Sequence, residues 1–217
     1  MNNIKAVIFD MDGVIFDTER IYLEDWTTIF KEYGYDMKRE LYLSVMGKGR
    51  KKVKEVFKET FGDALPIEEM YIKKDELLFQ RIKEGIALKE GVFEILDFLE
   101  TSGYKIALAT SAKKHRLNEQ FIKSSISKKF DVVVCGDDVT NSKPDPEIFL
   151  KAASLLDIKP EECTVIEDSQ AGIRSAYNAK MIPLHVKDLK DADEDITKYS
   201  YKNFENLIEI KKFFNSL

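Results

Sequence analysis

The amino-acid sequence predicts an α/β protein, in which a parallel sheet carries helices on both faces and a helical segment is inserted after the first strand. Three observations support this prediction. Short apolar runs, most of them rich in Val or Ile, alternate with segments of helical periodicity, as is typical of βαβ units. Residues 17–88 have helical periodicity but no strand-like run. Polar residues, many of them acidic, follow the ends of the predicted strands.

Five apolar runs are predicted to be buried strands, over residues 4–9, 104–110, 131–135, 163–166 and 181–186. Apolar residues at helical spacing predict helices over 91–100, 145–156 and 169–179, with Ser169 as the N-cap of the last. One more helix is expected over 203–214. Because short, continuously apolar strands of this kind are buried on both faces, helices should cover the sheet from both sides and give three layers.

Residues 17–88 are predicted to form a helical cap domain of about four helices. Apolar residues recur at helical spacing in three stretches of this segment, beginning at Tyr22, Val53 and Met70. Both ends of the segment lie near the C-terminal end of the first strand, where ligands bind in open parallel sheets. We therefore expect residues 1–16 and 89–217 to form one core domain and residues 17–88 to cover its ligand site.

Composition excludes several classes of protein. The 217 residues carry a net charge of -5 with acidic and basic residues interleaved, which gives no electrostatic case for a nucleic-acid partner. No apolar stretch approaches the roughly 20 residues of a membrane helix, and no secretory signal is visible. Cys135 and Cys163 both lie in apolar runs and are expected to be buried free thiols. We expect a cytoplasmic protein, either a monomer or a weak homodimer, without a membrane partner.

The residues that follow the predicted strands include four carboxylates, two hydroxyls and one ammonium. The carboxyl ends of parallel strands meet at one edge of a sheet, so these side chains should lie in one small pocket. They are Asp10, Asp12, Thr110, Ser111, Lys143, Glu167 and Asp168.

Such a pocket is suited to phosphoryl chemistry. Clustered carboxylates repel one another, and a hard divalent cation relieves that repulsion; oxygen ligands without His or Cys favour Mg²⁺. Lys143 and Thr110 could bind the remaining oxygens of a phosphate. A carboxylate can attack phosphorus and form an aspartyl phosphate. Of Asp10 and Asp12, one could attack while the other exchanges protons with the leaving oxygen and then with water.

With these residues in place, the chain resembles the haloacid dehalogenase superfamily, and within it the branch of β-phosphoglucomutase and small sugar-phosphate phosphatases. Four motifs carry the resemblance in the order typical of that branch, from residue 4 to about residue 185. They are DMDGVIFDTE, ALATS, SKPDPEIF and VIEDSQAGIRSAYNAKM. The resemblance implies a Rossmann-like three-layer core with an inserted helical cap, and a small phosphorylated metabolite as substrate.

The resemblance also implies individual roles. Asp10 would be the nucleophile and a Mg²⁺ ligand, and Asp12 would be the acid/base, with its backbone carbonyl on the metal. Glu167 and Asp168 would complete the metal site, Asp168 being the expected direct ligand.

The phosphate would be held by Thr110 together with the backbone amides of Ser111 and Ala112. Lys143 would neutralise charge on the nucleophile and on the transferring group. In the cap, the segment MGKGR resembles the loop whose arginine, here Arg50, reaches a substrate phosphate.

One departure bears on the reaction. The mutase has a histidine five residues after the aspartate that corresponds to Asp17, and this chain has Tyr22 there. That histidine couples cap closure to the acid/base, so its absence favours a phosphatase, with the mutase as the alternative. A cap lysine of the mutase could correspond to Lys73 or to Lys74.

Three other functions are less well supported. A dehalogenase would lack the second aspartate, Asp12. A signalling receiver domain would have its acidic pair before the phosphorylated aspartate, whereas Glu167 and Asp168 follow Asp10. A catalytically idle interaction protein would not need the full set of polar residues.

Overall fold

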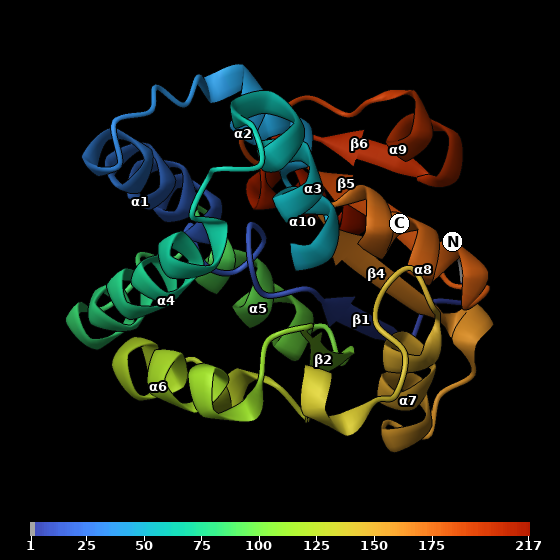
Figure 1. The fold of residues 1–217 in the computed structure, drawn as a ribbon. Coiled ribbons are helices and arrows are strands. Elements are labelled where there is room, and N and C mark those ends of the chain that lie inside the picture. Colours follow the sequence, from blue (N-terminus) through green and yellow to red (C-terminus); the bar gives the residue numbers. More distant parts are fainter. Residues whose placement is uncertain (1–2) are drawn as a thin grey trace.

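The core of the protein is a six-stranded parallel sheet with the strand order β3-β2-β1-β4-β5-β6 (Figure 1). The structure is a computed structural model and describes residues 3–217. The strands are β1 (Ala6–Phe9), β2 (Lys105–Ala109), β3 (Val132–Val134), β4 (Cys163–Glu167), β5 (Ile182–Val186) and β6 (Lys202–Phe204). Strand β1 lies inside the sheet between β2 and β4.

Helices cover both faces of the sheet and give the predicted three layers. In β1 the buried side chains alternate, so that Val7 and Phe9 join one apolar cluster while Ala6 and Ile8 join the other. The first face packs against α5 and α10, and the second against α7 and α8. The helices of the core are α5 (Val92–Thr101), α6 (Lys114–Ser124), α7 (Glu147–Leu155), α8 (Gln170–Asn178), α9 (Glu194–Tyr199) and α10 (Leu207–Phe214), with short 3-10 helices at 127–129, 136–138 and 160–162. The predicted fold class is confirmed.

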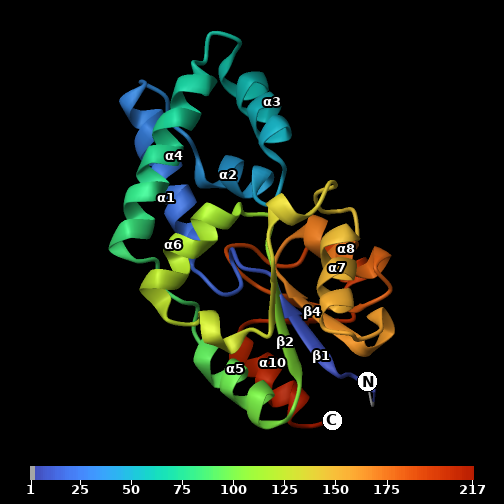
Figure 2. The same ribbon diagram turned by 90° about the horizontal axis from the view of Figure 1, so that it is seen from below.

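Four helices are inserted between β1 and α5. They are α1 (Thr18–Glu32), α2 (Arg39–Val45), α3 (Arg50–Phe61) and α4 (Ile67–Glu84). Figure 2 shows them to one side of the sheet. They enclose an apolar cluster of their own, in which Trp26 packs edge-on against Phe57 and Tyr71. The exact domain limits, residues 17–88 against the rest, stay a prediction.

The chain enters and leaves the insert along two neighbouring segments. The amide of Asp17 donates to the carbonyl of Ala87 at 2.9 Å, and the amide of Lys89 donates to the carbonyl of Ile15 at 2.9 Å. The insert is thereby joined to the sheet through a narrow connection beside the end of β1. Phe16 forms backbone bridges both to Asp12, just after β1, and to Leu88, just after the inserted helices.

The predicted C-terminal helix is wrong in its first part. Residues Lys202–Phe204 form β6, which pairs with β5, and α10 begins only after Asn206. The side chain of Asn206 accepts a hydrogen bond from the amide of Glu209 at 3.0 Å and so caps the helix there. Helices α6 and α9 were not predicted from the sequence. The predicted N-cap Ser169 is confirmed, because its hydroxyl accepts a hydrogen bond from the amide of Gly172 at 3.1 Å.

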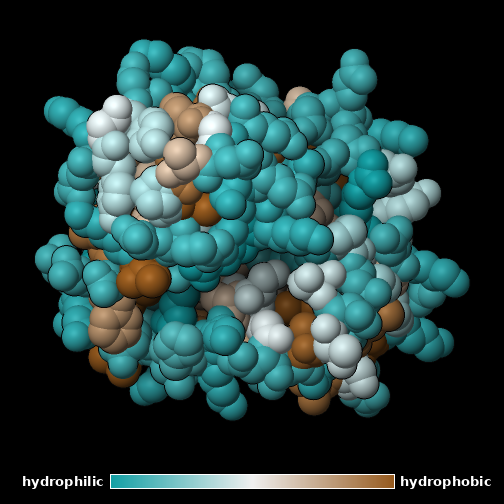
Figure 3. Space-filling model, in the orientation of Figure 1, coloured by the Kyte–Doolittle hydropathy of each residue, from teal (hydrophilic) through white to brown (hydrophobic). Residues whose placement is uncertain are grey.

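On the face drawn in Figure 3, hydrophilic side chains predominate and hydrophobic ones form small separate groups. Between residues 3 and 217, none of the helices combines the length and the apolar character that crossing a bilayer requires.

Candidate active site

The predicted polar residues lie around one cavity of about 420 Å³ between the strand ends and the helical insert. Residues Asp10, Asp12, Thr110, Lys143, Glu167 and Asp168 line it from the sheet side. The register of the sheet explains why they meet. Phe9 lies beside Leu108 of β2 and Ile166 of β4. Because the three strands are parallel, the residues that follow these positions all lie at the carboxyl edge of the sheet.

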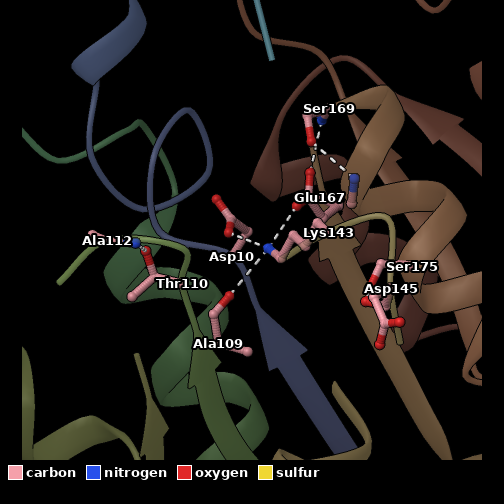
Figure 4. Close-up of polar contacts among 10 residues, drawn as sticks. Asp10, Ala109, Thr110, Ala112, Lys143, Asp145, Glu167, Ser169 and Ser175 are labelled. Atoms are coloured by element: carbon pink, nitrogen blue, oxygen red, sulfur yellow. Dashed lines mark hydrogen bonds and ion pairs between the residues drawn. The ribbon is translucent and has the colours of Figure 1, made fainter. Parts of the chain in front are cut away.

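Lys143 holds the centre of this site together (Figure 4). Its ammonium donates to Asp10 Oδ1 at 2.5 Å, to Glu167 Oε1 at 2.8 Å and to the carbonyl of Ala109 at 3.2 Å. The Lys143 side chain is only 6% exposed and that of Glu167 only 1%. Three acceptors around a buried ammonium fix both carboxylates in place.

Electrostatics leave Asp10 close to its titration point at neutral pH. Burial raises the pKa of Asp10 to about 7. The positive charge of Lys143 opposes this shift, while the negative charges of Glu167 and Asp12 add to it. Burial would lower the pKa of Lys143, but the two carboxylates outweigh burial and raise it above the ordinary value. Lys143 is therefore a permanent cation beside the predicted nucleophile.

Asp168 is packed against the turn that follows β1. A Cβ atom added to Gly13 would lie 2.5 Å from Asp168 Oδ2, and Gly13 has a φ of +78°. Only glycine allows both the left-handed backbone and this close approach. Burial, followed by the charges of Glu167 and Asp10, raises the pKa of Asp168 well above its usual value. Among residues 3–217, no group donates a hydrogen bond to its carboxylate.

Two of the four predicted carboxylates, those of Asp10 and Asp168, are suited to bind a hard cation. Glu167 is already bound by Lys143 and accepts the amide of Ser169 at 2.7 Å. The described part of the chain contains no group of three or more His, Cys, Asp or Glu side chains arranged to enclose an ion. Asp168, buried and without a donor, faces the negative charge of Asp10. These two oxygen donors next to the Asp12 backbone fit a hard cation; the ligand set itself stays a prediction.

The predicted phosphate-binding loop is only partly directed to the cavity. Thr110 and Ser111 line it, and Thr110 is almost completely buried. Ala112 does not line it, and its amide donates to Thr110 Oγ1 at 3.0 Å. In this arrangement the Ala112 amide orients the threonine hydroxyl (Figure 4).

Arg50 lies on the opposite wall, at the beginning of α3. Its guanidinium stacks on the ring of Tyr71 at 4.1 Å and pairs with Asp75 at 3.2 Å. The side chain is 51% exposed. Arg50 thus reaches the cavity from the insert but is engaged by an acidic neighbour.

The sequence did not point to three charged or polar residues at the site, Arg116, Glu19 and Tyr42, and it left Lys74 as one of two candidates for a cap lysine. Arg116 of α6 forms an ion pair with Asp12. Glu19, at the start of α1, lines the cavity and accepts a hydrogen bond from the Tyr42 hydroxyl at 2.5 Å. Burial raises the pKa of Glu19 to about 7, and the Tyr42 bond opposes the shift. Lys74 of α4 lies 4.3 Å from the ring of Tyr22. Glu19 is the last residue of the motif DMDGVIFDTE, so the motif could have indicated its place at the site.

Comparisons with known proteins agree with this geometry. The family model described as haloacid dehalogenase-like hydrolase matches residues 7–186, and the chain belongs to that family. It is 35% identical over 176 residues to the phosphorylated carbohydrates phosphatase of Thermotoga maritima, covering 81% of this chain and 82% of that protein. It is 32% identical over 179 residues to pyrophosphatase PpaX of Bacillus mycoides, covering 81% and 80%.

Solved structures give the same result. The β-phosphoglucomutase of Clostridium difficile superposes with a TM-score of 0.75 at 26% identity, covering 98% of this chain and 96% of that one. The chain is therefore an enzyme of this hydrolase family, as the sequence motifs indicated. The relatives differ in what their names say they act on, so the choice of substrate needs separate evidence.

Proposed function

We propose that the chain is a Mg²⁺-dependent phosphatase that hydrolyses a small phosphate monoester, a sugar phosphate or similar metabolite, through an aspartyl phosphate on Asp10. The observation that carries this proposal is the ammonium of Lys143, which contacts Asp10 and Glu167 at 2.5 and 2.8 Å inside a cavity of about 420 Å³. That volume is in the range of small-molecule sites. Membership of a hydrolase family supports the reaction class.

The reaction has two halves. First, a carboxylate oxygen of Asp10 attacks phosphorus, the bond from phosphorus to the leaving oxygen breaks, and Asp12 gives that oxygen a proton. Then a water oxygen attacks the same phosphorus, the bond to Asp10 breaks, and Asp12 takes the proton of the water. Lys143 offsets negative charge on Asp10 and on the transferring group throughout.

Asp10 and Asp168, together with the backbone carbonyl of Asp12, would hold the metal. Bound Mg²⁺ would supply positive charge that offsets the negative charge of the phosphoryl group. The Thr110 hydroxyl and the Ser111 amide would bind phosphoryl oxygens. Arg50 and Lys74, on the wall formed by the insert, would contact the rest of the substrate.

A phosphosugar mutase is the alternative, favoured by the similarity to a β-phosphoglucomutase. Tyr22 stands where that branch places its histidine, and neither His115 nor His185 lines the cavity. The proposal therefore assigns water, and not a sugar hydroxyl, as the acceptor.

The test is phosphate release from hexose phosphates, pentose phosphates, phosphoglycolate and pyrophosphate, with Mg²⁺ and with a chelator. We expect turnover of at least one sugar phosphate that the chelator abolishes. Asp10→Asn should remove it while the circular dichroism spectrum stays unchanged. Pyrophosphate as the sole substrate would contradict the substrate class. Conversion of a hexose 1-phosphate to its 6-phosphate without release would establish the mutase instead.

A further inference from the structure

The proposed acid/base, Asp12, has a cationic partner that the reaction scheme has not used. Arg116 donates from Nη2 to Asp12 Oδ1 across 104 positions of sequence. Among residues 3–217 this is the one side-chain contact of the Asp12 carboxylate, so Oδ2 is left without a partner. Asp12 lines the cavity, whereas Arg116 does not. Arg116 therefore lies behind Asp12 and not at the substrate.

Arg116 is held in this position by both parts of the molecule. It belongs to α6, which begins just after the Thr110–Ala112 turn of the site. Its guanidinium also lies 5.8 Å from the ring of Tyr22, in helix α1 of the insert. On the same ring, the ammonium of Lys74 from α4 lies at 4.3 Å. A core residue that touches Asp12 is thus packed beneath an aromatic ring of the insert.

A purely stabilising surface ion pair does not describe this contact well. The Arg116 side chain is 17% exposed, and its Nε is buried without a hydrogen-bond partner in the described residues. An unsatisfied buried donor destabilises the folded state, which offsets much of what one ion pair contributes. The ion pair with Asp12 therefore adds little net stability, although it joins Arg116 to a residue of the proposed reaction.

We propose that Arg116 is a positioning residue for proton transfer by Asp12, an inference that rests on the phosphatase proposed above. It binds Oδ1 and fixes the plane of the carboxylate, so that Oδ2 stays available to the leaving oxygen and then to water. Arg116 itself gains and loses no proton. Without it the Asp12 carboxylate can rotate, and the two proton transfers slow. The attack of Asp10 on phosphorus is spared only where the leaving group needs no proton.

The two halves of the reaction can be separated by the choice of leaving group. With p-nitrophenyl phosphate the leaving p-nitrophenolate needs no proton, so the first half does not depend on Asp12. The second half, attack by water, still does. With a sugar phosphate the leaving alkoxide needs a proton, so both halves depend on Asp12.

We therefore compare Arg116→Gln with wild type by rapid mixing and by steady-state turnover. With p-nitrophenyl phosphate we expect the ratio of first-turnover rate to steady-state rate to rise at least about tenfold in the variant. With the sugar phosphate that wild type hydrolyses fastest, we expect the first turnover itself to slow by about 10²-fold, the low end of what general acid–base catalysis contributes. A residue that only stabilised the fold would lower all these rates together and leave the ratio unchanged.

Two further variants complete the test. Arg174→Gln removes the exposed ion pair with Asp195, away from the cavity, and should leave all rates at the wild-type level. Arg116→Lys keeps a cation and should show the same pattern with smaller changes. If Arg116→Gln does not fold, Arg116→Lys decides, and a ratio equal to that of wild type contradicts the proposal. Failure of wild type to release phosphate from either ester would instead contradict the phosphatase assignment.

Discussion

Replacement of Lys143 by Met removes the ammonium that joins two buried carboxylates of the site, Asp10 and Glu167. Lys143 donates to Asp10 at 2.5 Å, to Glu167 at 2.8 Å and to the Ala109 carbonyl at 3.2 Å. After the substitution Glu167 keeps only the amide of Ser169, and Asp10 keeps no side-chain donor in residues 3–217. Removing one partner of a buried ion pair costs about 3–5 kcal/mol, so we expect this loss in the free energy of unfolding at pH 8.

The loss should shrink as the pH falls. Burial already raises the pKa of Asp10 to about 7, and removal of the opposing cation raises it further. Near pH 5 the native variant therefore holds a proton on Asp10 that the unfolded chain does not, and the buried charge disappears. The penalty should be smaller at pH 5 than at pH 8.

Urea denaturation followed by circular dichroism, with a chelator present, measures both effects. Lys105→Met is the matched control, because Lys105 is 55% exposed and its pair with Asp131 should contribute at most about 1 kcal/mol. In the double variant Lys143→Met, Glu167→Gln we expect about 1–3 kcal/mol of the loss to be recovered. A cost for Lys143→Met below about 1 kcal/mol at pH 8, or a larger cost at pH 5, would refute the electrostatic account.

Two further predictions concern Gly13 and Glu19. Gly13→Ala should cost about 1–2 kcal/mol of backbone strain, as should Gly34→Ala, since both have φ near +80°. Only Gly13→Ala, whose Cβ meets Asp168, should also lower phosphate release by tenfold or more; equal activity of the two variants would contradict the packing argument. The pKa of Glu19 is about 7 in the native state, against an ordinary value of 4.5. The native state is therefore destabilised as the pH rises from 4.5 to 7, because the unfolded chain loses this proton more readily. Glu19→Gln should be up to about 3 kcal/mol more stable than wild type at pH 8 and equal to it near pH 4, by urea denaturation; equal stability at both pH values would show that Glu19 is not desolvated.

The sequence was sufficient for the features that depend on short-range patterns. Buried parallel strands read as continuous apolar runs, and the residues after them must share one edge of the sheet, so Asp10, Lys143 and Glu167 could be brought together without coordinates. Strand β6 was missed because Lys202–Phe204 is a three-residue edge strand with two exposed positions, too short to show a period.

The insert side of the site could not be predicted in the same way. The packing of α1–α4 on one another and on the strand ends decides which of their residues face the cavity. Periodicity predicts which face of a helix is buried, but it does not predict what that face packs against. Glu19, Tyr42 and Lys74 were therefore not placed. Arg116 was missed because α6 itself was not identified, and its contact with Asp12 spans 104 positions.

The central claim is that phosphorus is bonded to the carboxylate of Asp10 during turnover. Acid quenching during turnover, followed by borohydride reduction of the acyl phosphate and peptide mass spectrometry, locates that bond directly. We predict reduction of the aspartate side chain at position 10, and none in enzyme quenched before substrate is added. Reduction at another carboxylate, or sustained phosphate release with an unmodified Asp10 under every quench time, would contradict the account.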